Sequence, residues 1–206
     1  MELNLTQEPL VVLLAGWSSG ISVYLTTGLL GLCGKCGWIA LPGDLKTIEN
    51  PVIFILAFLI FAVEFFADKI PYIDSAWDSV HTFIRPLGSL AIGYAAGSQH
   101  GPAVQVLYAM LAGTLTLNMH AAKAAGRLAI NTSPEPFSNI AASTAENSAV
   151  FFMYWLFVRH PYIAASIVIG ISILAFLLLR LLWGFAKKIF GWGKKGVSEN
   201  KDIKTV

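Results

Sequence analysis

The stretch Ala67–Arg85, reading ADKIPYIDSAWDSVHTFIR, places charged side chains beside segments that are otherwise almost entirely apolar. Asp74, Asp78, His81 and Arg85 are spaced i, i+4, i+7 and i+11, so a helix would carry all four on one face. An ionisable side chain costs roughly 2.5–3.5 kcal/mol at the centre of a membrane span. The stripe therefore predicts one of two placements: the interior of a helical protein, or the surface of a membrane.

The composition predicts an integral membrane protein. Of the 206 residues, 56% are hydrophobic and 13% are charged, whereas soluble domains carry about 25% charged residues. The formal net charge is only +2, but six lysines crowd the last twenty residues: Lys187, Lys188, Lys194, Lys195, Lys201 and Lys204. The positive-inside rule then places the C-terminus in the cytoplasm. A basic arm that binds lipid or nucleic acid is the alternative, and we expect no nucleic-acid partner.

Apolar periodicity and helix-breaking residues divide the chain into about six transmembrane helices, which gives an all-α fold class. The expected segments are Leu10–Gly34, Pro51–Asp68, Asp74–Gly97, Pro102–Asn131, Phe137–Val158 and Tyr162–Lys188. Together they form a single membrane domain over residues 1–190. Residues 191–206 are expected to be a disordered, lysine-rich cytoplasmic tail.

The chain repeats itself weakly. Lys69-Ile-Pro-Tyr-Ile follows the second segment and Arg159-His-Pro-Tyr-Ile follows the fifth. This pattern predicts two three-helix units, residues 10–97 and 102–188, with opposite orientations in the membrane. Chance similarity between short apolar segments is the alternative. The first and fourth segments hold matching places in the two units and are both unusually polar, which indicates a binding site between them.

A second charged face lies in the fourth segment, where His120, Lys123 and Arg127 are spaced i, i+3 and i+7. The third and fourth segments are joined by a short turn, so we expect an antiparallel hairpin that brings both faces to one level. We expect an anionic or polar group to bind to Arg85, His120, Lys123, Arg127 and Asn131. We expect Glu64, Asp68, Asp74, Asp78, His81 and Glu146 to take protons or coupling cations.

The alternative to a binding site is a structural one, in which the acids and bases pair with one another, for instance Asp78 with Arg127. Ser18, Ser19 and Ser22 are expected to bond to backbone carbonyls four residues earlier. Asp74, Asp78 and His81 also have a spacing compatible with metal ligands. The zinc, phosphate-binding and dinucleotide signatures are absent from the sequence, however, so we expect no metal, no cofactor and no catalytic residue.

Two long motifs resemble a bacterial family of multi-pass membrane proteins that is filed as a domain of unknown function. They are EFFADKIPYIDSAWDSVHTFIRP at residues 64–86 and HAAKAAGRLAINTSPEPFSN at residues 120–139, together with Glu146. The resemblance runs from the first segment to Pro161 and leaves out the last segment. It implies a bacterial inner-membrane location but no activity, substrate or cofactor.

The expected function is transport, or lipid translocation, of a small polar or anionic species through a charged vestibule. Its expected partners are the lipid bilayer and a small solute or lipid headgroup, and a homo-oligomer is one expected assembly. A membrane-embedded enzyme that acts on a lipid headgroup, using His81 or His120 with Asp78, is the second hypothesis. A structural membrane scaffold is the third.

Overall fold

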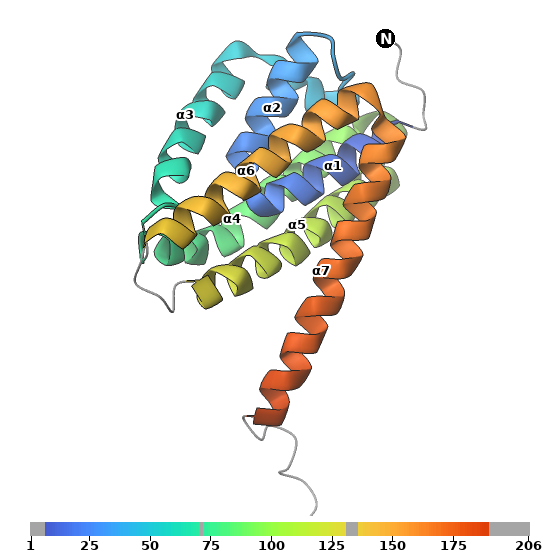
Figure 1. The fold of residues 1–206 in the computed structure, drawn as a ribbon. Coiled ribbons are helices and arrows are strands. Elements are labelled where there is room, and N and C mark those ends of the chain that lie inside the picture. The colour runs from blue at the N-terminus through green and yellow to red at the C-terminus, as the bar shows by residue number, and fades with distance from the viewer. Residues whose placement is uncertain (1–6, 71, 131–135, 190–206) are drawn as a thin grey trace, which may run out of the picture.

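The computed structural model describes residues 7–70, 72–130 and 136–189. These residues form α-helices and two short 3-10 segments, with no strand among them (Figure 1). The α-helices are α1 (Glu8–Ile21), α2 (Val23–Lys35), α3 (Pro51–Ala67), α4 (Ile73–Ala96), α5 (Pro102–Ile130), α6 (Pro136–Arg159) and α7 (Pro161–Ile189); the 3-10 segments are η1 (Gly43–Glu49) and η2 (Ser98–His100). The predicted all-α class is confirmed. The predictions for Asn131 and for the tail at residues 191–206 lie outside the described residues.

Local sequence signals determine most helix ends. The Oδ1 atom of Asn50 accepts a hydrogen bond from the Val52 amide at 2.9 Å, which caps α3, and Pro51 occupies the first turn. Gly101, with φ of 83°, lies in the turn between α4 and α5, in a region that favours glycine. The predicted boundaries of the second to sixth segments are confirmed to within about two residues.

The first predicted segment, Leu10–Gly34, is wrong as a single helix because the chain breaks at Ser22. The Ser22 backbone is extended, with φ of −155° and ψ of 115°, and its Oγ accepts a hydrogen bond from the Leu25 amide at 3.1 Å. A side chain that bonds to its own backbone in this way competes with helix continuation. The predicted i−4 bond is confirmed at Ser18, whose Oγ donates to the Leu14 carbonyl at 2.7 Å. It is wrong for Ser22, and for Ser19, whose Oγ has no hydrogen-bond partner among the described residues.

Helix α1 forms the centre of the bundle. Its side chains are buried on every face, and Val12, Leu14 and Trp17 are at most 2% exposed. Helices α4 and α5 pack together as an antiparallel hairpin, and both contact α1 (Figure 1). Helix α2 packs on α3, while α6 and α7 contact α1 from another direction.

Two glycines let α1 approach α5 closely. A Cβ added at Gly16 would lie 2.9 Å from the Ala112 backbone, and one at Gly20 would lie 2.9 Å from the Thr116 carbonyl. The Thr116 Oγ1 donates a hydrogen bond to the Gly16 carbonyl at 2.7 Å across the same interface. This spacing of small residues permits close backbone packing between helices. The same close packing of α1 on α5 places the helix break at Ser22 beside the charged face of α5.

The substitution Gly20→Ala is expected to destabilise the fold by about 1–3 kcal/mol, because the added methyl group meets backbone atoms that cannot rotate away. Thermal unfolding of the purified protein in detergent measures the loss. Gly170→Ala in α7 is the control, since a Cβ there has no neighbour within 4 Å. Equal melting temperatures for the two variants would contradict the proposed close approach.

The outer surface of the bundle is apolar. Large hydrophobic side chains are exposed on α3 to α7, among them Leu59, Phe83, Leu107, Trp155 and Leu181. By length and composition one described helix, Pro161–Lys188, could cross a membrane; η1 and α3 qualify as a second candidate if they count as one segment bent by 71°. The C-terminal half of α7 extends away from the other helices (Figure 1).

Candidate functional site

The two charged stripes face each other inside the bundle. Asp74, Asp78, His81 and Arg85 of α4 are at most 5% exposed, so the first of the two predicted placements, in the protein interior, is confirmed. Three side chains of α5 are also buried: His120, Lys123 and Arg127. The antiparallel hairpin therefore brings the two faces together, as predicted.

Arg85 organises the half of this site nearest α3. Its Nη2 donates to Oε1 of Glu64 at 2.8 Å, and its Nη1 lies 3.0 Å from Oδ1 of Asp78. Asp78 also lies 3.8 Å from the Nζ atom of Lys123, which pairs more closely with Asp68 at 2.9 Å. These contacts tie together α4, α5 and the C-terminal end of α3.

Arg127 organises the half nearest α6. Its Nη2 donates to Oε2 of Glu146 at 2.7 Å, and its Nη1 lies 3.8 Å from Oδ1 of Asp74. The same Nη1 donates to Oδ1 of Asn139 at 3.1 Å and to the Asp68 carbonyl at 3.3 Å. Glu146 also lies 3.8 Å from Lys123, so it joins the two halves into one ion-pair network.

The ion-pair network holds more carboxylates than cations. Its members are five carboxylates and three cations: Glu64, Asp68, Asp74, Asp78, Glu146, Arg85, Lys123 and Arg127. Lys69, which lies nearby, bonds to Ser143 and to the Phe65 carbonyl instead. If Lys69 is counted as a fourth cation, the five carboxylates still outnumber the cations by one.

Asp78 is held in the network by ion pairs and not by hydrogen bonds from the described residues. It is 5% exposed, and neither of its carboxylate oxygens accepts a hydrogen bond from another described residue, although Oδ1 lies close to Arg85. Buried polar atoms usually have a partner, so such an atom needs an explanation. A proton, a water molecule or a cation would each satisfy these oxygens.

The break between α1 and α2 is part of the site. The Lys123 Nζ donates to the Ile21 carbonyl at 3.4 Å, at the C-terminal end of α1. The Ser22 hydroxyl, at the N-terminal end of α2, donates to Glu64. A cation therefore meets the negative end of one helix dipole and a carboxylate meets the positive end of the next. Both charges are in favourable positions.

The two buried histidines have hydrogen-bond partners at both ring nitrogens. Arg85 can only donate, so its 2.7 Å contact makes Nδ1 of His120 an acceptor and leaves the Nε2–H to donate to Thr82 at 2.9 Å. The Nδ1–H of His81 donates to the Trp77 carbonyl at 2.7 Å, and its Nε2 accepts from Tyr24 at 3.2 Å. These contacts fit a neutral imidazole in both cases.

Two details of the sequence prediction need correction. Asp78 pairs with Arg85 and Lys123 rather than with Arg127, whose nearest carboxylate is Glu146. The network also lies mainly between α4 and α5, with α3 and α6 completing it, and not between the first and fourth predicted segments. The first segment contributes only its broken region, because α1 turns most of its length to the apolar core.

Sequence reasoning missed Ser22, Thr82 and Asn139 as site residues. Asn139 lies within the second motif, two residues after the start of the fifth expected segment at Phe137, and that position is its only sequence signal. Ser22 stands two residues after a glycine in a polar segment, but nothing local distinguishes it from Ser18. Their roles depend on partners far away in the chain.

The fold and the network define an all-helical protein whose charged residues are buried at a helix break. The chain belongs to the family described as domain of unknown function DUF4126, whose profile matches residues 10–181. The predicted resemblance to a family of unknown function is therefore confirmed, and it extends through most of α7 rather than ending at Pro161. No curated protein and no solved structure matches the chain.

Proposed function

We propose that this protein is a multi-pass protein of the bacterial inner membrane with six crossings, the first of them broken at Ser22. Exposed apolar side chains on α3 to α7, combined with charges held inside, support this placement. Lys187 and Lys188 in the last turn of α7 support a cytoplasmic C-terminus. The two inverted three-helix units, residues 10–97 and 102–188, are part of the same proposal.

Within that membrane protein, the function we propose is proton-coupled transport of a small polar or anionic species. One observation carries the proposal: a buried network at a helix break pairs every one of its cations with a carboxylate and still has carboxylates in excess. Broken helices in the membrane commonly supply transport sites. A lipid headgroup is the second kind of anion that such a site could move.

The coupling follows from competition for the same cations. While the carboxylates are ionised, they hold Arg85, Lys123 and Arg127, and an incoming anion meets no free positive charge. Protonation of a carboxylate removes its attraction for the paired cation, which then becomes available to the anion. Proton and anion would thus enter together and leave together.

Glu146 is the proposed point of proton entry, and Asp78 is the proposed inner proton site. Glu146 is the most accessible member of the network, with 24% of its side chain exposed, and it contacts both Arg127 and Lys123. Asp78 is buried and bridges Arg85 and Lys123, and its oxygens accept no hydrogen bond from the described residues. Both carboxylates lie 3.8 Å from the Nζ atom of Lys123, so protonation of either one weakens the hold on the same cation.

The substitution Glu146→Gln is expected to reduce proton-coupled transport roughly tenfold or more, because glutamine cannot take up the proton at the proposed point of entry. The measurement uses protein in liposomes with a trapped pH dye, an inward proton gradient, and phosphate or succinate outside. A fluorescent phosphatidylglycerol analogue tests lipid translocation in parallel. Glu49→Gln in η1 is the matched control and should transport normally. Wild-type vesicles that move no proton, anion or lipid under any gradient would refute the proposal.

The structural hypothesis has one observation in its favour, which is the nearly complete pairing of the network. Buried ion pairs that fasten a bundle need no ligand, and apolar replacements can be equally stable. The enzyme hypothesis gains less support, because the ring nitrogens of His81 and His120 already bond to Trp77, Tyr24, Thr82 and Arg85.

A further inference from the structure

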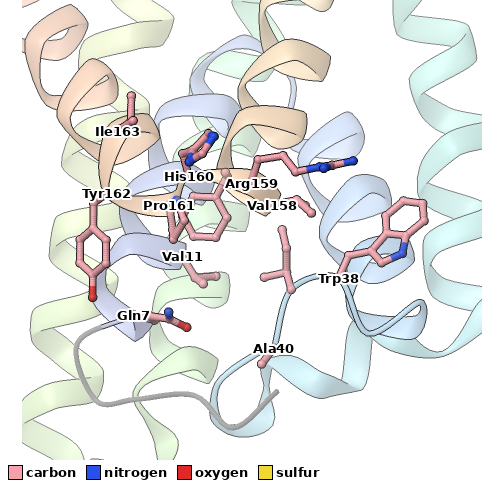
Figure 2. A pocket seen from close by; sticks show the side chains of 12 residues that line it. Gln7, Val11, Trp38, Ala40, Val158, Arg159, His160, Pro161, Tyr162 and Ile163 are labelled. Carbon is pink, nitrogen blue, oxygen red and sulfur yellow. The ribbon is translucent and has the colours of Figure 1, made fainter.

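A cavity of about 370 Å³ lies at the corner between α6 and α7 (Figure 2), at the end of α6 opposite its start beside the ion-pair network (Figure 1). Its walls come from the start of α1, the loop at Trp38–Ala40 and the corner between α6 and α7. Arg159, at the end of α6, lies thirteen residues beyond Glu146, which is about 20 Å along a helix. The cavity is therefore a separate place from the proposed transport site.

The cavity combines basic side chains with an apolar floor. Arg159 and His160 lie on its rim, while Val11, Ile39 and Phe157 form apolar walls. None of the described residues that line it is acidic. Among the described residues, the cavity therefore presents positive charge from Arg159 that no carboxylate neutralises, which favours an anionic ligand.

Two exposed aromatic side chains flank the cavity on opposite sides (Figure 2). Trp38 is 56% exposed and Tyr162 is 58% exposed. Trp and Tyr are enriched where the hydrocarbon of a bilayer meets its headgroups. From the cavity, exposed apolar side chains continue along α7, beginning with Ile163 and Ile167. The basic rim would meet the phosphate of a phospholipid, the aromatic side chains would lie at the level of its glycerol esters, and the apolar wall would meet its acyl chains.

We propose that this cavity binds the phosphate-bearing headgroup of an anionic phospholipid. The guanidinium of Arg159 contacts the phosphate oxygens, since its paired N–H groups match phosphate geometry. The acyl chains lie against the apolar face of α7. This inference rests on the membrane location proposed above but not on transport.

Native mass spectrometry of the delipidated, detergent-purified full chain tests the proposal. Titration with dioleoyl phosphatidylglycerol should give discrete lipid adducts, and phosphatidylcholine should bind more weakly. The substitution Arg159→Gln should weaken phosphatidylglycerol binding about fivefold, the effect expected for one basic residue facing anionic lipid. Lys46→Gln is the matched control, because it removes the same charge from an exposed position in η1, outside the cavity.

Several results would overturn the proposal. Equal binding of phosphatidylglycerol by the Arg159→Gln and Lys46→Gln variants would remove the cavity as its site. Equal affinity for phosphatidylcholine would show that the site does not select negative charge. Inorganic phosphate that binds alone, and displaces the lipid at the same concentration, would indicate a soluble anion instead. Since the readout is lipid binding, a failure of transport would leave this test unaffected.

Discussion

Replacing Arg85 with leucine is expected to cost about 3–5 kcal/mol of stability, which would leave little folded protein. Arg85 is fully buried and contacts Glu64, Asp78 and His120. Leucine fills similar space but leaves two buried carboxylates without their strongest cation. Orphaned buried charge is far more costly than the absence of an ion pair, so the loss should exceed that of any exposed substitution.

Thermal unfolding in detergent measures this loss of stability. Two further variants test whether the loss comes from burial and from charge. Arg180→Leu changes an exposed arginine of α7 and should alter stability by no more than about 0.5 kcal/mol. Adding Glu64→Gln and Asp78→Asn to Arg85→Leu should recover most of the loss, because no unpaired carboxylate then remains beside the leucine. If the triple variant is as unstable as the single one, Arg85 acts by packing rather than by charge.

Helix boundaries were predictable because their causes are local. Asn50 and Pro51 begin α3 through a cap and a fixed φ, and neither needs a distant partner. The stripes on α4 and α5 were equally readable, since a period of 3.6 residues brings Asp74, Asp78, His81 and Arg85 to one face in any helix. Their burial was one of the two placements that the sequence predicted.

The break at Ser22 and the pairing within the network could not be predicted in the same way. Ser22 has the same side chain as Ser18, yet one caps a helix and the other bonds back to the preceding turn. What separates them is the carboxylate of Glu64, which lies forty-two residues away in sequence and accepts the Ser22 hydroxyl. The choice of Glu146 over Asp78 as partner for Arg127 depends on how α6 packs, which is also a long-range property.

The inverted repeat and the function stay predictions. The first and fourth predicted segments occupy matching places in the two units, but the first is broken at Ser22 whereas α5 continues for 29 residues. A broken helix facing an unbroken one would make the two halves of a carrier unequal, with the break supplying backbone groups on one side only. Lys123 contacts that break, and so it connects the polar face of α5 to the first unit.

The pair formed by Lys123 and Asp68 separates the transport proposal from the structural hypothesis. Lys123→Met alone should destabilise the protein by about 3–5 kcal/mol, because it leaves Asp68 buried without its cation. Adding Asp68→Asn removes that charge, so the double variant should return to within about 1–2 kcal/mol of the wild type, the residual loss being the bond from Lys123 to the Ile21 carbonyl.

Coupled transport by the folded double variant is expected to fall to the level of protein-free liposomes, since Lys123 is the proposed anion ligand and lies 3.8 Å from both Glu146 and Asp78. The same vesicle assay, with equal amounts of folded protein in each sample, measures it. A double variant that is both stable and fully active would mean that the charges only fasten the bundle. A double variant that is stable and inactive would mean that the pair of Lys123 and Asp68 acts on the transported species or its coupled proton, because the structural contribution of the pair has then been replaced.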